Sequence, residues 1–253
     1  MCSFPIVNWT AIESMKAMVF AAGRGTRLAP LTDSHPKCLV EAGGKPLLQH
    51  CLEWLHSHGV SAVVVNTHHH ADEVREWIEA FQLTGMELSI SHEPKLLETG
   101  GGLLAARDHF QSEEHFLAVN SDVFTDLNLT ALWDHHTSCN NLATLAVASR
   151  TSTRYLRFDE HQLLTGWENQ KTGDSVHWGS EEDSRLAFNG IQVFSRNYFE
   201  HLEKHQGAFS NIPIFLEAAR SGGRIEAYAM DSAAWFDVGT IEKLESLRRY
   251  LAG

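Results

Sequence analysis

The stretch that decides the fold is Lys16 to Ala22 (KAMVFAA), which leads directly into Gly23 to Thr32 (GRGTRLAPLT). A short apolar run that stops at a glycine is typical of a buried strand. Glycine permits positive φ and close backbone approach, and successive N–H groups in such a loop can cradle phosphate oxygens. The stretch therefore predicts a strand that opens into a phosphate-binding loop. The alternative is a tight turn with solvated arginines.

Strand and helix patterns alternate from this point to Ala148. The predicted strands are 61–66, 87–92, 115–120 and 142–148, and the predicted helices are 71–81, 102–110, 127–136 and one between Pro46 and Gly59. Such alternation implies parallel strands with helices on both faces, so the predicted class is α/β, a three-layer α/β/α fold with a mostly parallel central sheet. Ligands of such sheets bind beyond the carboxyl ends of the strands.

The rest of the chain is less regular. We expect a hairpin at 155–167, a polar loop at 168–183, strands at 188–194 and 224–229, and helices at 212–220 and 241–251. No clear linker divides the sequence. The predicted organisation is therefore a poorly ordered N-terminal extension (1–15) followed by one domain (16–253), whose later half lines one side of the site.

Charge and composition exclude several classes of protein. The formal net charge is −12, which disfavours nonspecific binding to nucleic acid. No apolar run approaches the roughly 20 residues that span a bilayer, so no membrane partner is expected. The four cysteines include no C-x-x-C pair, as expected for reduced thiols in the cytoplasm.

The glycine loop carries a family resemblance. G-x-G-T-R-L-x-P-L-T at Gly23 to Thr32, then Pro36-Lys37 and G-K-P-L-L at Gly44 to Leu48, resembles the opening of the sugar-nucleotide pyrophosphorylases. The dinucleotide fingerprint would need a glycine at Leu28, and the chain has no P-loop motif. The resemblance implies a Rossmann-like, glycosyltransferase-A-like nucleotidyltransferase fold, Mg²⁺ as cofactor, and a nucleoside triphosphate and a sugar 1-phosphate as substrates. We expect a monomer or a small homo-oligomer.

The resemblance also assigns roles in binding the nucleotide. Arg27 would hold the triphosphate and Lys37 would contact the phosphates at the reacting centre, as the two catalytic cations. A second cluster, Leu97 to Gly102 (LETGGG), predicts a close-packed loop and a free helix N-terminus, although a flexible turn is the alternative. The nucleotide-binding residues implied are Ala21, Ala22, Gly23, Gly25, Thr26, Glu98, Thr99, Gly100 and Gly101.

Two aspartates are the candidate metal ligands. Asp122 ends a buried apolar strand, where a carboxylate costs desolvation unless it has a partner, and Mg²⁺ is a suitable one. The alternative for Asp122 is a cap or turn. Trp235 to Thr240 (WFDVGT) resembles the family's W-x-D-[VI]-G-T, whose aspartate, here Asp237, is the second ligand. The two acids are distant in sequence and must meet through the fold. Thr240 also suits an N-cap for the last helix.

The sugar side of the resemblance is less complete. Phe188 to Ile191 (FNGI) resembles the family's F-x-G-I, which makes Asn189 a candidate sugar contact, with a strand-edge amide as the alternative. Many relatives carry E-K in a preceding segment, where this chain has Glu168-Asn169. Glu168 would bind a sugar hydroxyl. The missing lysine leaves the phosphate partner open, with Lys171 as one substitute.

Together these features predict in-line transfer of a nucleoside monophosphate to a sugar 1-phosphate, with release of pyrophosphate. The E-T-G-G-G form favours UTP and N-acetylmuramate 1-phosphate. The alternatives are mannose-1-phosphate guanylyl transfer, cytidylyl transfer onto a phosphocholine-type acceptor, and a noncatalytic nucleotide-sugar sensor. A sensor would have lost part of the set Arg27, Lys37, Asp122 and Asp237. The short remainder after Thr240 is expected to hold no further domain.

Overall fold

The structure, a computed structural model, describes residues 15–253, so the predicted N-terminal extension lies outside the described residues except for Met15, which opens the first strand. The strands are β1 (Met15–Phe20), β2 (Glu41–Ala42), β3 (Lys45–Pro46), β4 (Val60–Thr67), β5 (Glu87–His92), β6 (His115–Asn120), β7 (Val123–Thr125), β8 (Ala143–Ala148), β9 (Arg154–Phe158), β10 (Leu164–Asn169), β11 (Ser175–His177), β12 (Ser184–Ser195), β13 (Ile225–Ala229) and β14 (Trp235–Asp237). The α-helices are α1 (Leu47–Ser57), α2 (Ala71–Ala80), α3 (Glu98–Ala105), α4 (Leu129–Ser138), α5 (Phe199–Leu202), α6 (Asn211–Arg220) and α7 (Ile241–Leu251).

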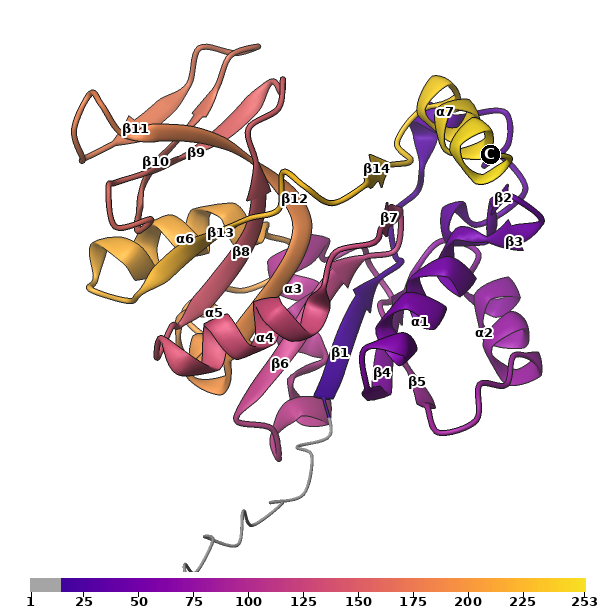
Figure 1. The fold of residues 1–253 in the computed structure, drawn as a ribbon. Coiled ribbons are helices and arrows are strands. Elements are labelled where there is room, and N and C mark those ends of the chain that lie inside the picture. Colours follow the sequence, from indigo (N-terminus) through magenta and orange to yellow (C-terminus); the bar gives the residue numbers. More distant parts are fainter. Residues whose placement is uncertain (1–14) are drawn as a thin grey trace, which may run out of the picture.

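The central sheet confirms the predicted α/β class. Strands β5, β4, β1 and β6 pair in parallel, in that spatial order (Figure 1). Strand β12 then pairs antiparallel with both β6 and β8, and β13 pairs parallel with β8. Sequence alternation alone would place β8 beside β6. The later strand β12 separates them, so the second half of the chain contributes to the middle of the sheet.

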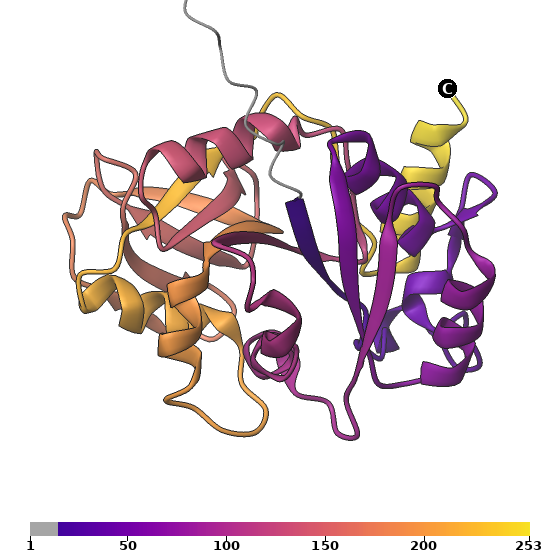
Figure 2. The ribbon, with the colours of Figure 1, turned by 90° about the horizontal axis from the view of Figure 1, so that it is seen from below.

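Two apolar clusters cover the two faces of the sheet. On one face, side chains of α1, α2 and α4 pack against alternate residues of β1, β4 and β6. On the other face, α3, α5 and α6 pack against the intervening residues of the same strands and against β9 and β10. Figure 2 shows α1 and α2 on one side of β1 and β4 and α3 on the other. Because successive side chains of a strand point to opposite faces, each strand serves both clusters, which gives the three predicted layers.

The last helix returns to the beginning of the chain. Leu244 and Leu247 of α7 are buried against Leu28 of the glycine loop and Val40. Thr240 caps this helix, because its hydroxyl accepts the N–H of Lys243 at 3.4 Å, as predicted. This packing carries the segment just before α7, including β14, to the edge of the sheet where the glycine loop lies (Figure 1). Among residues 15–253, no helix is long and apolar enough to cross a membrane.

The hairpin region differs from the prediction. β9 and β10 form the expected hairpin, but the segment predicted as a polar loop contains β11, which pairs with β10. Gly166 explains the close pairing, since a Cβ there would lie 2.5 Å from the carbonyl oxygen of Val176. The polar, exposed character of β11 concealed its strand conformation from pattern analysis. This three-stranded extension continues from β12 and forms one wall beside the site.

Candidate active site

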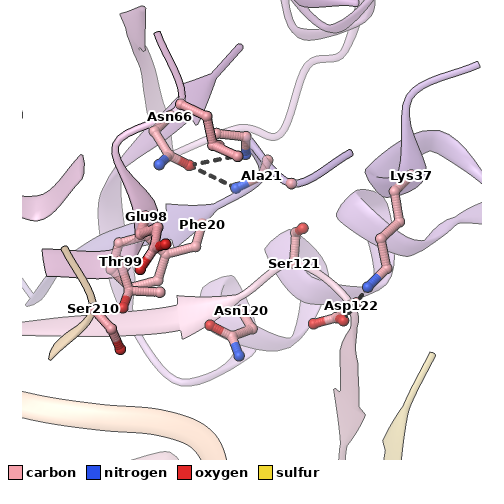
Figure 3. A pocket seen from close by; sticks show the side chains of 13 residues that line it. Phe20, Ala21, Lys37, Asn66, Glu98, Thr99, Asn120, Ser121, Asp122 and Ser210 are labelled. Atoms are coloured by element: carbon pink, nitrogen blue, oxygen red, sulfur yellow. Dashed lines mark hydrogen bonds and ion pairs between the residues drawn. The ribbon is translucent and has the colours of Figure 1, made fainter. Parts of the chain in front are cut away.

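A cleft of about 360 Å³ opens at the carboxyl ends of β1, β4 and β6, where the parallel-sheet prediction places ligands. Figure 3 shows the side chains that line it. The lining residues are Phe20, Ala21, Ala22, Gly23, Lys37, Asn66, Leu96, Glu98, Thr99, Asn120, Ser121, Asp122 and Ser210. Six of the predicted nucleotide-contacting or catalytic positions are therefore in this lining, together with Asp122. Its residues come from the first three βα units, from the end of β6 and from the segment before α6.

A buried polar network fixes the start of the glycine loop. Oδ1 of Asn66 accepts the N–H groups of Ala21 at 2.6 Å and of Ala22 at 3.2 Å (Figure 3). Its Nδ2 donates to Oε1 of Glu93 at 2.6 Å, and Oε2 of Glu93 accepts the N–H of Leu97 at 2.9 Å. Glu93 is fully buried. The network therefore joins the loop after β1 to the segment before α3 and orients both without a ligand.

This network limits what Ala21 and Ala22, two predicted nucleotide contacts, can offer to a ligand. The N–H groups of Ala21 and Ala22 are occupied by Asn66, so these residues offer the cleft their side chains and carbonyls. Sequence analysis did not identify Asn66 or Glu93 as site residues. Asn66 ends an apolar β-branched run as its lone amide, which was the available signal.

Gly25 brings the loop onto Lys37. Its φ is +64°, and a Cβ at this position would lie 2.8 Å from Cβ of Lys37. The hydroxyl of Thr32 donates to the carbonyl of Gly25 at 2.9 Å and holds the loop in this conformation. Gly23 has open space around its Cα. Of the two glycines, Gly25 is thus required by the protein itself, whereas Gly23 leaves room in the cleft. Thr26 is exposed and begins a single 3₁₀ turn.

The second glycine cluster lies inside a helix and not before one, contrary to the prediction. Helix α3 begins at Glu98, and the N–H groups of Gly100 and Gly101 donate to the carbonyl of Phe209 at 2.9 and 3.1 Å. A Cβ on Gly100 would lie 2.5 Å from the Phe209 ring. The glycines therefore permit α3 to pack against the segment before α6. Nucleotide contact by Gly100 and Gly101 stays a prediction.

Two residues of the same cluster do reach the cleft. Glu98 and Thr99 line it, and Glu98 has a φ of +60°, which is uncommon for a residue with a side chain. The hydroxyl of Thr99 accepts the N–H of Asn211 at 3.0 Å. The first turn of α3 is thereby held from both sides, by Glu93 through Leu97 and by the start of α6, while Glu98 stays directed to the cleft (Figure 3).

The two aspartates meet through strand pairing. β7, which follows Asp122, pairs antiparallel with β14, so that Asp237 is opposite Val123. The N–H of Val238 donates to the backbone carbonyl of Asp122 at 2.8 Å. Backbone pairing therefore brings Asp237 beside the turn that holds Asp122, which lines the cleft. Shared binding of one metal ion by the two carboxylates stays a prediction.

The catalytic cations predicted from sequence lie beside these acids. Lys37 forms a short ion pair with Oδ2 of Asp122 (Figure 3). Arg27 is exposed, and its Nη2 lies 3.1 Å from the point that a Cβ on Gly239 would occupy, while Oδ1 of Asp237 lies 2.9 Å from the same point. Lys37 is thus paired with Asp122, and Arg27 lies near Asp237 across the space that Gly239 leaves open.

The donor set at this edge fits a hard divalent cation. Asp122 and Asp237 present carboxylate oxygens, the ligands that Mg²⁺ prefers. Here each carboxylate faces an ammonium group, Lys37 for Asp122 and, at 2.7 Å, Lys243 for Asp237. The negative charge of the two carboxylates is therefore balanced by lysine side chains.

A wall next to the cleft, formed by residues outside its lining, holds Asn189 and an arginine that carries no motif in the sequence. The register of β12 against β8 shifts between Phe188 and Gln192, and Asn189 lies in this irregular segment. Arg150, just after β8, donates from Nε to Oδ1 of Asn189 at 2.8 Å, and its guanidinium lies 4.1 Å from the centroid of the Trp235 ring. Arg150 carries no local motif, so only the fold reveals its place beside the predicted sugar contact.

Glu168 is on the same wall but is already paired. Its two carboxylate oxygens bind Arg157, at 3.4 Å, and Arg185, in a short ion pair. Contact with a sugar hydroxyl would have to share these oxygens with the two arginines and stays a prediction. Lys171, the substitute considered for the missing lysine, lies exposed in the turn between β10 and β11.

Comparison with known proteins identifies the family and several relatives of this chain. The model of the family described as nucleotidyl transferase matches residues 16–252. The mannose-1-phosphate guanylyltransferase catalytic subunit beta of Drosophila pseudoobscura pseudoobscura is 31% identical over 246 residues, which cover 94% of this chain and 62% of that protein. The N-acetylmuramate alpha-1-phosphate uridylyltransferase of Neisseria meningitidis serogroup B is 28% identical over 240 residues, which cover 94% of this chain and 99% of that protein.

The fold also matches solved structures. The crystal structure of HddC from Yersinia pseudotuberculosis, complexed with GMP-PN, superposes with a TM-score of 0.75 at 19% identity and covers 93% of this chain and 99% of that chain. At this identity the likeness is one of fold. The chain spans about three fifths of the guanylyltransferase subunit and nearly all of the uridylyltransferase.

Proposed function

The chain belongs to the nucleotidyl transferase family, and on that premise we propose that it transfers a nucleoside monophosphate from a nucleoside triphosphate to a sugar 1-phosphate. The observation that carries the proposal is the pairing of β7 with β14, which brings Asp122 and Asp237 to the cleft edge beside Lys37 and Arg27. A noncatalytic nucleotide-sugar sensor would have no need to retain all four charged groups.

In this proposal the residues of the chain act by position and charge. The acceptor phosphate is already anionic, so no general base is needed, and its oxygen forms a bond to the α-phosphorus as the bond to pyrophosphate breaks. Lys37 moves from Asp122 to the oxygens of the triphosphate, and Arg27 binds the departing pyrophosphate. Once they contact the phosphates, these cations lower the barrier because they need no further reorganisation when charge shifts. The Asn66–Glu93 network keeps the loop in place throughout.

Asp122 and Asp237 would hold Mg²⁺, which supplies charge neutralisation at the α-phosphate and the pyrophosphate when bound. The carboxylate pair and its two lysine counter-charges support this assignment. Mg²⁺ together with a nucleoside triphosphate should therefore raise the melting temperature of the wild type. The same addition should raise it less in Asp237→Asn, since one oxygen ligand is then neutral.

For the substrates, we propose UTP and N-acetylmuramate 1-phosphate, with GTP and mannose 1-phosphate as the second candidate. The uridylyltransferase of Neisseria is matched over nearly its whole length, whereas the guanylyltransferase subunit is matched over 62% of its length at slightly higher identity. We place the reaction in the cytoplasm, because Cys38, Cys51 and Cys139 are free thiols.

Pyrophosphate release tests the proposal. Purified protein is incubated with each nucleoside triphosphate against a panel of sugar 1-phosphates and phosphocholine, with and without Mg²⁺. We expect release with one triphosphate and one sugar 1-phosphate, only in the presence of Mg²⁺. Release with phosphocholine alone would favour the cytidylyl alternative. Tight nucleotide binding without release for any pair would contradict transfer and favour the sensor.

A further inference from the structure

Arg150 is a cation without an acidic partner in the wall opposite the glycine loop. Its Nη2 donates to the carbonyl of Phe188 at 3.0 Å and its Nε to Oδ1 of Asn189 at 2.8 Å. Trp235 stacks on the guanidinium and donates from Nε1 to the carbonyl of Asn189 at 2.9 Å. Among residues 15–253, no carboxylate lies within ion-pair distance of Arg150 and no acceptor meets its Nη1. These contacts hold the side chain in place and leave its Nη1 without a hydrogen-bond partner in the described chain.

Two other arginines of this wall each have an acidic partner. Arg157 and Arg185 share Glu168. Arg150, by contrast, is half-buried, and burial lowers its pKa, while the nearby charge of Asp237 and the Tyr155 hydroxyl oppose that shift. Arginine stays protonated in proteins, so a partly desolvated positive charge remains here. Such a charge is costly unless an anion accompanies it.

The position of Arg150 connects the sugar side of the cleft to the metal side. Trp235, on which it stacks, is two residues before Asp237 in β14. Asn189, which it binds, precedes Gly190, where a Cβ would lie 2.6 Å from Nδ2 of the cleft residue Asn120. Nδ2 of Asn189 is itself buried without a hydrogen-bond partner in the described chain. Two donors of this corner, Nη1 of Arg150 and Nδ2 of Asn189, therefore have no acceptor in the described chain.

We propose that Arg150 binds the phosphate of the acceptor sugar 1-phosphate, and that it does what a lysine at Asn169 would otherwise do. The inference rests on the proposed function and names the residue that recognises the acceptor. Arg150 holds two non-reacting phosphate oxygens. The third oxygen is then directed at the α-phosphorus, where its bond forms as the bond to pyrophosphate breaks. Arginine suits this task because its planar fork can bind two phosphate oxygens at once.

Steady-state kinetics with both substrates varied tests the inference. The variants are Arg150→Gln and Arg150→Lys, and Lys171→Gln is the matched control, because Lys171 is the competing cation and lies exposed in a turn. We expect Arg150→Gln to raise the KM for the sugar 1-phosphate by about 10- to 100-fold, with the KM for the triphosphate changed less than about twofold. Arg150→Lys should recover part of the loss, and Lys171→Gln should behave like the wild type.

Two further readouts separate binding from folding and from the proposed function. Inorganic phosphate should compete with the sugar 1-phosphate in the wild type and compete more weakly in Arg150→Gln, while circular dichroism shows that the variants are folded. An unchanged KM in folded Arg150→Gln, or a larger rise in Lys171→Gln, would overturn the inference while transfer itself stands. A wild type that turns over no sugar 1-phosphate would overturn both.

Discussion

The two walls of the cleft are built differently. The nucleotide wall consists of the glycine loop, Asn66 and the start of α3, and its polar groups are satisfied by one another through Asn66 and Glu93. The wall that we assign to the acceptor consists of the end of β8, the irregular part of β12 and β14, and among the described residues nothing accepts from Nη1 of Arg150 or Nδ2 of Asn189. The polar groups of the first wall are thus paired without a ligand, whereas in our proposal the acceptor phosphate completes the second.

This difference follows from chain connectivity. The nucleotide wall is made by successive βα units, so each loop is supported by the strand before it and the helix after it. The acceptor wall joins segments that are far apart in sequence, since β12 inserts between β6 and β8 and β14 pairs with β7. A rigid wall suits a triphosphate common to many enzymes. A wall with unsatisfied donors suits recognition of a particular acceptor.

The largest loss of turnover is expected for a substitution in the nucleotide wall, at Lys37. Lys37→Met should lower turnover by about 100- to 1,000-fold, because the cation that faces the reacting phosphates is lost while the apolar stem is kept. The measurement is single-turnover transfer at saturating substrates. Lys45→Met is the matched control, since Lys45 forms a partly exposed ion pair with Glu53 outside the cleft. A folded Lys37→Met protein that transfers at the rate of Lys45→Met would remove Lys37 from the mechanism.

A second effect concerns the stability of that wall. Asn66→Ala should lower the free energy of unfolding by about 2–4 kcal/mol, because two backbone N–H groups and the buried carboxylate of Glu93 lose their partner together. Urea denaturation of the variant beside the wild type measures the loss. A change in this free energy below about 0.5 kcal/mol would show that water replaces Asn66, and that the polar groups of this wall do not depend on one another.

Elements with a strong local pattern could be predicted from the sequence, whereas those that depend on a distant packing partner could not. The strands at 87–92 and 115–120 and the helix at 241–251 are predicted to the residue, because their periodicity is local and strong. The helix predicted at 102–110 begins earlier in the structure, at Glu98, since its glycines are needed for packing against Phe209. Local patterns contain no information about a packing partner so far along the chain.

Site residues follow the same division. Gly25 and Lys37 stand in a contiguous motif, and the structure brings them into contact. Arg150 and Asn66 are single polar residues without a motif, and their roles depend on which strands the fold places side by side. The sequence offers Lys171, close to Asn169 along the chain, as a replacement cation. The cation that we propose, Arg150, comes from the segment after β8, which sequence spacing could not indicate.

Another prediction concerns how the stability of the contact between α4 and β8 depends on pH. His136 of α4 is buried beneath β8 and bonds the Thr144 hydroxyl at 2.8 Å, and burial, with the nearby His115 and His135, lowers its pKa from 6.5 to about 3. Because the unfolded chain takes up this proton first, the contribution of His136 to stability is complete above about pH 6.5 and is lost as the pH falls toward 3.

Urea denaturation between pH 7.5 and pH 4.5 measures this dependence. Below pH 6.5, His136 should contribute a loss of up to about 1.4 kcal/mol for each pH unit. His136→Gln should be less stable at pH 7.5 and show a shallower slope, because glutamine keeps a polar contact but does not titrate. Equal slopes in the two proteins would show that His136 is accessible to protons in the folded state.

A double-mutant cycle on Asp122 and Asp237 shows whether the two carboxylates act on one cation. Single-turnover transfer is measured for the wild type, Asp122→Asn, Asp237→Asn and the double variant at saturating Mg²⁺. If both acids hold the same ion, the first substitution removes most of the benefit, and the double variant should be little slower than the slower single variant. If the two losses multiply, the acids act independently and the account is contradicted.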